Sequence, residues 1–126
     1  MALRDGKALM PFGSPGNDVQ PQAMLQVFLN LNVFGMDLQS AIEAPRFATY
    51  SYPASSAPRV YYPARLNLEK RISRDTGDAL AALGHDVSAW PEWEWRAGAV
   101  CAVMAGEEGT RWGAADPRRG SLSIGY

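Results

Sequence analysis

The most regular pattern of apolar and polar positions runs from residue 22 to residue 34 and predicts a helix. Gln22, Gln26 and Asn30 are spaced four apart and form one narrow polar stripe, whereas most other positions of the segment are apolar. Apolar residues around most of the circumference are typical of a helix that is buried on most sides. We therefore expect this helix to lie in the interior of the folded protein.

The residues on either side of this helix predict how it begins and ends. The run Gly13–Asn17 is rich in glycine and proline and predicts a turn. Asp18 is the expected N-cap, and Pro21 suits the first turn, where its missing N–H has no intrahelical partner to lose. Gly35 follows the last apolar residue, as a glycine that ends a helix does.

Shorter patterns predict two further helices and several strands. Asp-Gly is a favoured two-residue hairpin turn, serine and aspartate cap helices, and proline or glycine ends them. The expected elements are a hairpin over 1–12 around Asp5-Gly6, a helix from Asp37 to about Glu43 that Pro45 ends, a strand at 66–69, a helix capped by Ser73 or Asp75 and ended by Gly84, a strand at 86–90, and a hairpin of 98–105 with 110–115.

The order of these elements is strands, then helices, then strands. This order predicts an α+β fold with mostly antiparallel strands and two or three helices, and it fits a parallel βαβ sheet less well. The chain has 126 residues, of which 47% are hydrophobic. Residues 1–126 are therefore expected to form a single globular domain or part of one.

Residues 48–63 differ in composition from the rest of the chain. They combine Tyr50, Tyr52, Tyr61 and Tyr62 with several prolines and serines, and no period of two or 3.6 residues persists. A structureless stretch of this length is unusual inside a self-sufficient domain. We expect an extended segment that lies on another part of the protein, where tyrosines with polar tips suit the contact.

Charge and residue counts exclude several classes of function. The formal net charge is −1, which gives no electrostatic reason to bind nucleic acid or an anionic membrane. No apolar run approaches the roughly 20 residues that span a bilayer. Cys101 is the only cysteine, so it has no internal disulfide partner, and we expect it to be buried in a strand. One histidine and one cysteine do not make a usual zinc site, and neither a metal nor a cofactor is expected.

Three motifs, in order along the chain, carry a resemblance to a known family. They are GSPG at 13–16, FGMDLQ at 34–39 leading into AIEAPRF at 41–47, and GAADPRRG at 113–120. The segment LAALGHDV at 80–87 fits as well. Over nearly its whole length the chain resembles the small subunit of the gamma-glutamyltranspeptidase family, within the N-terminal-nucleophile hydrolases. The match is to the C-terminal portion of that subunit and implies half of a four-layer αββα sandwich.

The resemblance implies a catalytic role for the turn before the long helix. In the family's GSPGG pattern, the two final glycines supply the backbone N–H groups that stabilise the oxyanion of acyl transfer. These positions are Gly16 and Asn17 here, which are therefore the expected catalytic donors. Asn17 departs from the glycine of the pattern. It keeps its backbone N–H, and asparagine tolerates a positive φ better than most residues. Its side chain would narrow the pocket or alter substrate preference. The alternative is an ordinary strand-to-helix turn.

The chain contains no convincing activated nucleophile. The resemblance implies a threonine at the start of the small subunit, whose α-amino group serves as base for its own hydroxyl. Thr49, Thr76 and Thr110 are not preceded by a processing site like that of the family. We therefore expect the nucleophile to lie upstream and the chain to be truncated. A weaker alternative is a serine hydrolase that uses Ser14 and His85.

Ser14 and Arg46 are the candidate substrate-binding residues. An arginine binds a carboxylate through two parallel hydrogen bonds. The alternatives are a structural ion pair for Arg46 and a turn-shaping role for Ser14. Asp116 is expected to pair with an arginine and hold a loop. Trp90, Trp93 and Trp95 either flank a ligand or belong to an edge strand that packs against a neighbour.

Together these observations predict the C-terminal fragment of a gamma-glutamyltranspeptidase-like enzyme, which transfers or hydrolyses gamma-glutamyl or related acyl groups through a covalent threonine intermediate. Without the nucleophile, the chain alone is expected to be inactive. The alternative is a non-enzymatic binding module on the same scaffold. The expected partners are the large subunit and the remainder of the small subunit, or a second copy of the chain, and a small gamma-glutamyl or amide substrate. The compartment, cytoplasmic or exported, stays open.

Overall fold

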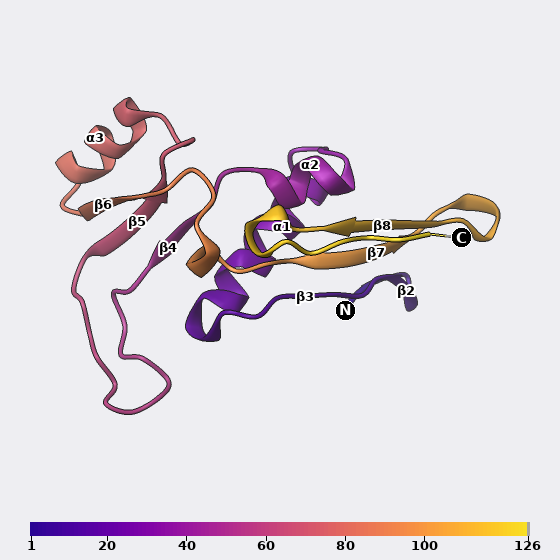
Figure 1. The fold of residues 1–126 in the computed structure, drawn as a ribbon, viewed down its shortest axis with the longest axis horizontal. Coiled ribbons are helices and arrows are strands. Elements are labelled where there is room, and N and C mark those ends of the chain that lie inside the picture. The colour runs from indigo at the N-terminus through magenta and orange to yellow at the C-terminus, as the bar shows by residue number, and fades with distance from the viewer. Residues whose placement is uncertain (126) are drawn as a thin grey trace.

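The computed structural model describes residues 1–125, which form three small sheets and three α-helices (Figure 1). The elements, in chain order, are β1 (Ala2–Arg4), β2 (Lys7–Met10), β3 (Phe12–Gly13), the 3-10 turn η1 (Asn17–Val19), α1 (Gln20–Asn32), α2 (Leu38–Glu43), β4 (Phe47–Thr49), β5 (Arg65–Glu69), α3 (Arg74–Ala82), β6 (Asp86–Trp90), η2 (Trp95–Ala97), β7 (Cys101–Ala105), η3 (Glu107–Gly109), β8 (Arg111–Ala115) and η4 (Pro117–Arg119). Figure 1 shows α3 with β4, β5 and β6 at one end, the β7–β8 hairpin reaching to the other, and α1 and α2 between them.

The strands pair in three groups. β1 and β2 form an antiparallel hairpin, and the order β3-β7-β8 is antiparallel throughout. In the third sheet β4 is antiparallel to β5, whereas β5 is parallel to β6 because α3 carries the chain back between them. The predicted α+β fold with mostly antiparallel strands is confirmed, with one parallel pair that the order of elements did not indicate.

The local turn and cap signals of the sequence are confirmed where they were strongest. Asp5 and Gly6 both have positive φ, 51° and 75°, as the favoured two-residue hairpin turn requires. The carboxylate of Asp37 accepts a hydrogen bond from the backbone N–H of Ser40 at 3.0 Å and so caps α2. Ser73, rather than the alternative Asp75, caps α3.

The main core lies between α1, α2 and one face of the β3-β7-β8 sheet. Side chains alternate between the two faces of a strand. In β7 this alternation buries Ala102 but turns Cys101 and Val103 outward. The prediction that Cys101 is buried is therefore wrong, because its place in the alternation, which neighbouring residue types do not reveal, decides the face.

The long helix α1 is less buried than its composition predicts. Only Ala23 and Val27 are fully buried, whereas Leu25, Val33 and Phe34, on the helix and just beyond its end, are 57%, 65% and 68% exposed. The helix packs against α2 and the sheet on one side, and residues 1–125 leave its other apolar side uncovered. The expectation of burial on most sides is therefore wrong for this chain by itself.

The polar stripe of α1 has a structural task. The side-chain amide of Gln22 pairs with the backbone N–H and C=O of Thr49, at 2.9 and 3.1 Å, and Gln26 pairs in the same way with Phe47. Both backbone residues lie on the outer edge of β4, which has no neighbouring strand among residues 1–125. The amide of Asn30 donates to the carbonyl of Ala41 and joins α1 to α2. The stripe thus fastens the helix to a sheet edge and to the next helix.

Four buried charged residues connect the two larger sheets. Arg118 forms a two-fold ion pair with Glu69, with both N···O distances 2.7 Å, and contacts Asp116 at 3.1 Å. Asp116 also binds Arg46 at 2.7 Å, and all four side chains are almost inaccessible to solvent. The expected pairing of Asp116 with an arginine is confirmed, within a larger network that holds the β4-β5-β6 sheet against the β7–β8 hairpin.

Candidate functional site

The turn between β3 and α1 has a backbone that few residue types adopt. Gly16 has a φ of 132° and Asn17 a φ of 52°. The first value is open essentially to glycine, and the second lies in the left-handed region that asparagine tolerates better than most residues. The replacement of a second glycine by Asn17 is therefore compatible with this turn.

Two backbone amides of this turn take no part in the hydrogen bonds among residues 1–125. The carbonyl of Gly16 accepts from the N–H of Val19 at 3.1 Å and starts η1. The N–H groups of Gly16 and Asn17, in contrast, donate to no other residue within 1–125. Both residues line a cavity of about 440 Å³. Unpaired N–H groups at the start of a helical segment make an environment that favours negative charge.

The turn is held from behind by the segment that precedes β7. The hydroxyl of Ser14 accepts from the N–H of Ala99 at 2.9 Å and donates to the carbonyl of Pro15 at 2.7 Å. Gly98 stands so close that an added Cβ would lie 2.7 Å from the Ser14 hydroxyl and 3.1 Å from the Cβ of Ala23. Contacts this tight fix the position of the turn relative to the sheet.

Asp18 does not cap α1, so that prediction is wrong. The 3-10 turn η1 comes first, and α1 begins one residue after Val19. The Asp18 carboxylate instead accepts from the N–H of Ser55 at 3.0 Å, and hydrogen bonding by Ser55 lowers the pKa of Asp18. The Tyr52 hydroxyl donates to the Asp18 carbonyl at 3.1 Å. The loop after β4 is thereby anchored to the turn, as the expected contact with another part of the protein requires.

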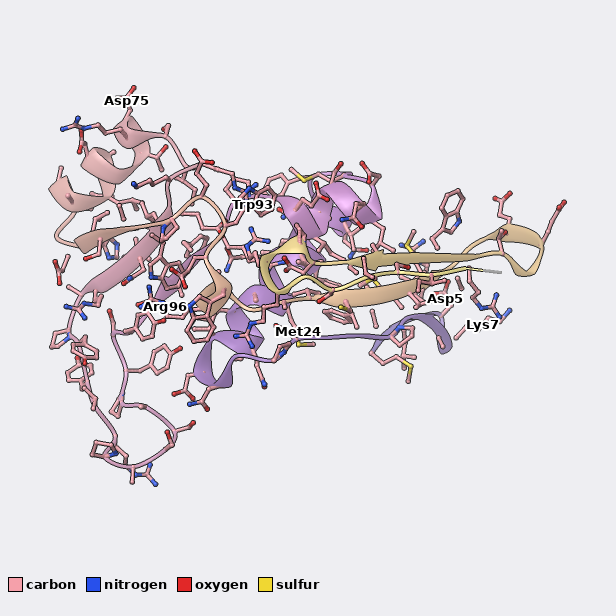
Figure 2. All side chains as sticks on the ribbon, in the orientation of Figure 1. Asp5, Lys7, Met24, Asp75, Trp93 and Arg96 are labelled. Atoms are coloured by element: carbon pink, nitrogen blue, oxygen red, sulfur yellow. The ribbon has the colours of Figure 1, made fainter. Side chains whose placement is uncertain are left out.

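The cavity is lined by aromatic residues and by two arginines. The loop between β4 and β5 contributes Tyr50, Tyr52, Val60 and Tyr62, while η2 and η4 contribute Trp95, Arg96 and Arg119. Figure 2 shows Arg96 where η2 faces the loop after β4. Burial raises the pKa values of Tyr50 and Tyr52, so both hydroxyls are neutral near pH 7 and neither is a ready base.

The two arginines of the cavity differ in how they are paired. Arg96 binds the carboxylate of Glu94 through two hydrogen bonds of 2.8 and 2.9 Å, and these bonds raise the pKa of Arg96 and lower that of Glu94. Arg119 donates only through Nε, to the Trp95 carbonyl at 3.0 Å, and its guanidinium lies 5.2 Å from the centre of the Trp95 ring. No carboxylate within residues 1–125 pairs with Arg119.

The structure separates the residues that the sequence grouped as candidates. Gly16 and Asn17 line the cavity, whereas Ser14 lies behind the turn and Arg46 lies in the core, where it is 2% exposed. The guanidinium of Arg46 donates to the carbonyls of Ile42 and Ala97 as well as to Asp116. These positions give Arg46 the structural ion pair, and Ser14 the turn-shaping role, that were weighed as alternatives. Direct substrate contact by either stays a prediction.

The three tryptophan candidates lie in different places. Trp90 is 3% exposed and belongs to a small core cluster with Val19, Ala48 and Ala97. Trp95 lines the cavity, where it lies beside Arg119. Trp93 packs under Arg71, whose guanidinium lies 3.6 Å from the ring centre, and it also contacts Arg118 of the buried network. Figure 2 shows Trp93 and Arg96 apart from one another. Sequence reasoning did not single out Arg96 and Arg119, because nothing in the local pattern distinguishes them from solvated arginines.

The geometry of a serine hydrolase is not assembled here. The hydroxyl of Ser14 bonds to backbone groups of Pro15 and Ala99, while His85 lies at the turn between α3 and β6, away from β3 (Figure 1). Within residues 1–125 no group of three histidine, cysteine, aspartate or glutamate side chains is arranged to hold a metal ion. None of the helices in this part of the chain has the length and hydrophobicity needed to cross a membrane.

Comparison with known proteins covers the whole chain. Residues 1–126 match the family described as gamma-glutamyltranspeptidase. The chain is 31% identical over 127 residues to the glutathione hydrolase proenzyme of Escherichia coli strain K12, covering 100% of this chain and 20% of that protein. It is 32% identical over 127 residues to the oxamate amidohydrolase proenzyme of Klebsiella pneumoniae, covering 98% of this chain and 22% of that protein. The chain thus spans about a fifth of the length of these relatives.

A solved structure shares the fold. An acivicin-inhibited gamma-glutamyltranspeptidase superimposes with a TM-score of 0.75 and 27% sequence identity, covering 95% of this chain and 58% of the other. The predicted architecture, part of an N-terminal-nucleophile hydrolase αββα sandwich, is confirmed. From the match over all its residues and from the shared fold, the chain belongs to the gamma-glutamyltranspeptidase family.

Proposed function

We propose that this chain supplies the oxyanion-stabilising turn of an enzyme that transfers or hydrolyses gamma-glutamyl or related amide-linked acyl groups. The observation that carries the proposal is the pair of unpaired N–H groups of Gly16 and Asn17 at the edge of a cavity. Family membership supports it, because a turn of this kind at this position is what the resemblance implies. The relatives named glutathione hydrolase and oxamate amidohydrolase agree in being named for amide cleavage.

The chemistry needs fixed donors at this point. When a nucleophile adds to an amide carbonyl, its oxygen becomes an anion in the tetrahedral intermediate. Backbone donors about 2.7–3.1 Å from that oxygen stabilise the transition state, and the loss of one lowers the rate by about 100- to 1000-fold. The donors here need no rearrangement to act, because the turn is already held by Ser14, Ala99 and Gly98.

The nucleophile is proposed to come from outside this chain. No serine, threonine or cysteine is among the cavity-lining residues within 1–125. Thr49 bonds through its hydroxyl to Ser51 and to the carbonyl of Arg65, and Thr76 bonds to Ser73. In the proposed reaction a threonine hydroxyl of the parent enzyme attacks the carbonyl, the C–N bond breaks, and the amine leaves with a proton from the threonine's own α-amino group. Water or a second amine then takes the acyl group.

The uncovered apolar side of α1 supports the proposal that another polypeptide packs against this chain. Leu25, Val33 and Phe34 expose a continuous apolar side and end of α1, and monomeric proteins rarely leave such a patch open. We propose that the rest of the parent enzyme, its large subunit and the remainder of its small subunit, covers this surface. Sedimentation of the isolated chain tests this, because self-association or instability is expected, and a stable monomer would contradict it.

A chimeric enzyme tests the catalytic role. This chain would replace the matching segment of the Escherichia coli glutathione hydrolase, and release of p-nitroaniline from a gamma-glutamyl anilide would be measured. The α-hydroxy analogue of asparagine at position 17 replaces the backbone N–H by an ester oxygen and leaves the side chain unchanged. We expect it to lower the rate by about 100- to 1000-fold, because one oxyanion donor is lost. Asn17→Gly keeps the N–H and is expected to keep the rate.

The matched control places the same ester at position 57. The carbonyl before Ala57 accepts a turn hydrogen bond from Arg59 at 2.8 Å, as the carbonyl before Asn17 accepts one from Val19 at 3.1 Å. Both esters therefore weaken one turn bond, but only the ester at position 17 removes a proposed oxyanion donor. Equal rates for the two ester proteins would overturn the oxyanion role.

A binding module without chemistry is the second candidate. It is favoured by the absence of a nucleophilic side chain among the cavity-lining residues of 1–125. The sequence of the parent gene distinguishes the enzyme from the binding module. A threonine preceded by a self-cleavage context upstream of this segment supports the enzyme, and a parent sequence without such a threonine supports the binding module.

A further inference from the structure

The cavity beside Gly16 and Asn17 combines two features that select a ligand. Its volume of about 440 Å³ is in the range of small-molecule sites. Tyr50, Tyr52 and Tyr62 provide aromatic surface from the loop after β4, and Trp95 provides more from η2. Aromatic walls favour a flat ring over an aliphatic chain of similar size, because stacked and edge-to-face contacts add to the area that is buried.

Among residues 1–125, the charges around the cavity leave one cation, Arg119, without a carboxylate partner. Arg96 is neutralised by two hydrogen bonds to Glu94, and the carboxylate of Asp18 is engaged by the N–H of Ser55. Arg119 uses only its Nε, so within residues 1–125 the two terminal nitrogens of its guanidinium have no hydrogen-bond partner. The edge formed by the two terminal nitrogens of a guanidinium can bind a carboxylate with two parallel hydrogen bonds.

The environment of Arg119 fits a ring as well as an anion. Its guanidinium already lies near the Trp95 ring, and Arg65 lies 4.3 Å from the centre of the Tyr62 ring in the same region. Two of the aromatic residues that line the cavity, Tyr62 and Trp95, thus each lie beside an arginine. A ring that packs on these aromatic groups is expected to place an attached carboxylate at Arg119 rather than at Asp18, because the charge of Arg119 attracts it and that of Asp18 repels it.

We propose that this cavity is a binding subsite for an aromatic ring that carries a carboxylate. The inference rests on the proposed function for its catalytic meaning: the natural substrate is then an amide with an anionic aromatic group next to the bond that is cleaved. The anchored tyrosine loop and Arg119 are the specificity-determining elements, and the amides of Gly16 and Asn17 receive the carbonyl oxygen.

Binding to the chimeric enzyme, in which the rest of the parent fold covers α1, tests the subsite without any turnover. The probe is phenylacetate, followed by two-dimensional NMR of the backbone amides of Gly16 and Asn17 and of the Trp95 indole. Cyclohexylacetate keeps the charge and removes the aromatic ring, and phenylacetamide keeps the ring and removes the charge. We expect cyclohexylacetate to bind about three- to tenfold more weakly than phenylacetate. We expect Arg119→Gln to weaken phenylacetate by at least about tenfold and to leave phenylacetamide unchanged.

Matched variants separate the subsite from general effects on the fold. Tyr62→Leu removes a cavity ring, whereas Tyr61→Leu changes its exposed neighbour, which does not line the cavity. Arg74→Gln removes an exposed arginine on α3 as the control for Arg119→Gln. Arg119→Lys keeps the charge and is expected to restore part of the affinity.

Three results would contradict the proposed subsite. The proposal is overturned if phenylacetate shows no saturable binding up to about 10 mM, if cyclohexylacetate binds equally well, or if Arg119→Gln has no more effect than Arg74→Gln. These readouts are independent of the ester experiment at position 17. If the subsite proposal fails, the affinity for the probe does not depend on its aromatic ring or its charge. If the proposed catalytic role fails, the ester at position 17 leaves the rate of the chimera unchanged.

Discussion

The side-chain amide of Gln26 binds the backbone of Phe47 as a neighbouring strand would. Its oxygen accepts from the Phe47 N–H at 3.1 Å, and its nitrogen donates to the Phe47 carbonyl at 2.9 Å. Gln22 repeats the arrangement with Thr49 one turn earlier. An unpaired strand edge is a template for wrong pairing, and here two glutamines of α1 close it. Gln39 forms the same kind of pair with Ala115 at the edge of β8.

Replacing Gln26 by leucine is expected to destabilise the fold. The change removes both hydrogen bonds to Phe47, and because this edge is partly solvent-exposed, water replaces them in part. We expect a loss of about 1 kcal/mol in the free energy of unfolding, measured by urea denaturation. Gln20→Leu, at the exposed start of the same helix, is the control and should change stability by less than about 0.5 kcal/mol. Equal effects of the two variants would contradict the role of the paired amide.

Replacing Arg118 by methionine is expected to lower the free energy of unfolding far more than Gln26→Leu does. Arg118 neutralises Glu69 through two 2.7 Å contacts and also binds Asp116, and all three side chains are buried. Arg118→Met leaves Glu69 paired only with the partly exposed Arg71 and Asp116 paired only with Arg46, and breaking a buried ion pair in this way costs up to about 3–5 kcal/mol. Arg74→Met, on a side chain that is 93% exposed, is the matched control and should be nearly neutral. Chemical denaturation of both variants gives the comparison, and a loss below about 1 kcal/mol for Arg118→Met would count against the network.

The same network predicts a loss of stability in acid. Burial by itself raises the pKa of Glu69, but hydrogen bonds from Arg118 and from the N–H of Arg46, together with the Arg118 charge, outweigh it and leave the pKa lowered. A carboxylate with a lowered folded pKa stabilises the protein fully above its unfolded pKa of about 4.3, and the contribution is lost as the pH falls through the folded value. Glu69→Gln removes this contribution.

Unfolding measured from pH 7 down to about pH 3 checks this expectation. The difference in stability between the wild type and Glu69→Gln should be constant above about pH 5 and should shrink below it. A difference that stays the same over the whole range would show that Glu69 does not carry the acid sensitivity.

Gly98 is expected to be essential for the position of the turn that contains Gly16 and Asn17. An added Cβ would meet the Ser14 hydroxyl at 2.7 Å and the Cβ of Ala23 at 3.1 Å. Gly84 is a close control, because its φ of 98° resembles the 86° of Gly98, but nothing lies within 4 Å of an added Cβ there. Gly84→Ala measures the backbone strain alone, and Gly98→Ala adds the clash.

We expect Gly98→Ala to lower the free energy of unfolding by about 1–3 kcal/mol more than Gly84→Ala. In the chimeric enzyme, Gly98→Ala should also lower the rate, because the Gly16 backbone lies against Gly98. Equal stabilities of the two variants would mean that the turn moves to accommodate the added methyl group without a loss of stability.

Much of the local structure was predictable because its causes are local. The hairpin at Asp5-Gly6 and the caps at Asp37 and Ser73 depend on residues within a few positions, and the structure has them. Asp18 shows the limit of such reasoning. It has the right chemistry for a cap, but Ser55, 37 positions away, holds its carboxylate.

The order of apolar, polar and turn residues by itself determined where the helices and most of the strands form, since backbone preferences act between near neighbours. It did not indicate β4. The tertiary structure decided the rest: which edges the glutamines close, that Arg46 lies in the core while Arg119 faces a cavity, and that Cys101 points outward. These outcomes join residues far apart in sequence, such as Ser14 and Ala99 at a separation of 85. Only the packing of α1, α2 and the sheets brings such groups together, because hydrogen bonds and ion pairs act over a few ångströms in space regardless of distance along the chain.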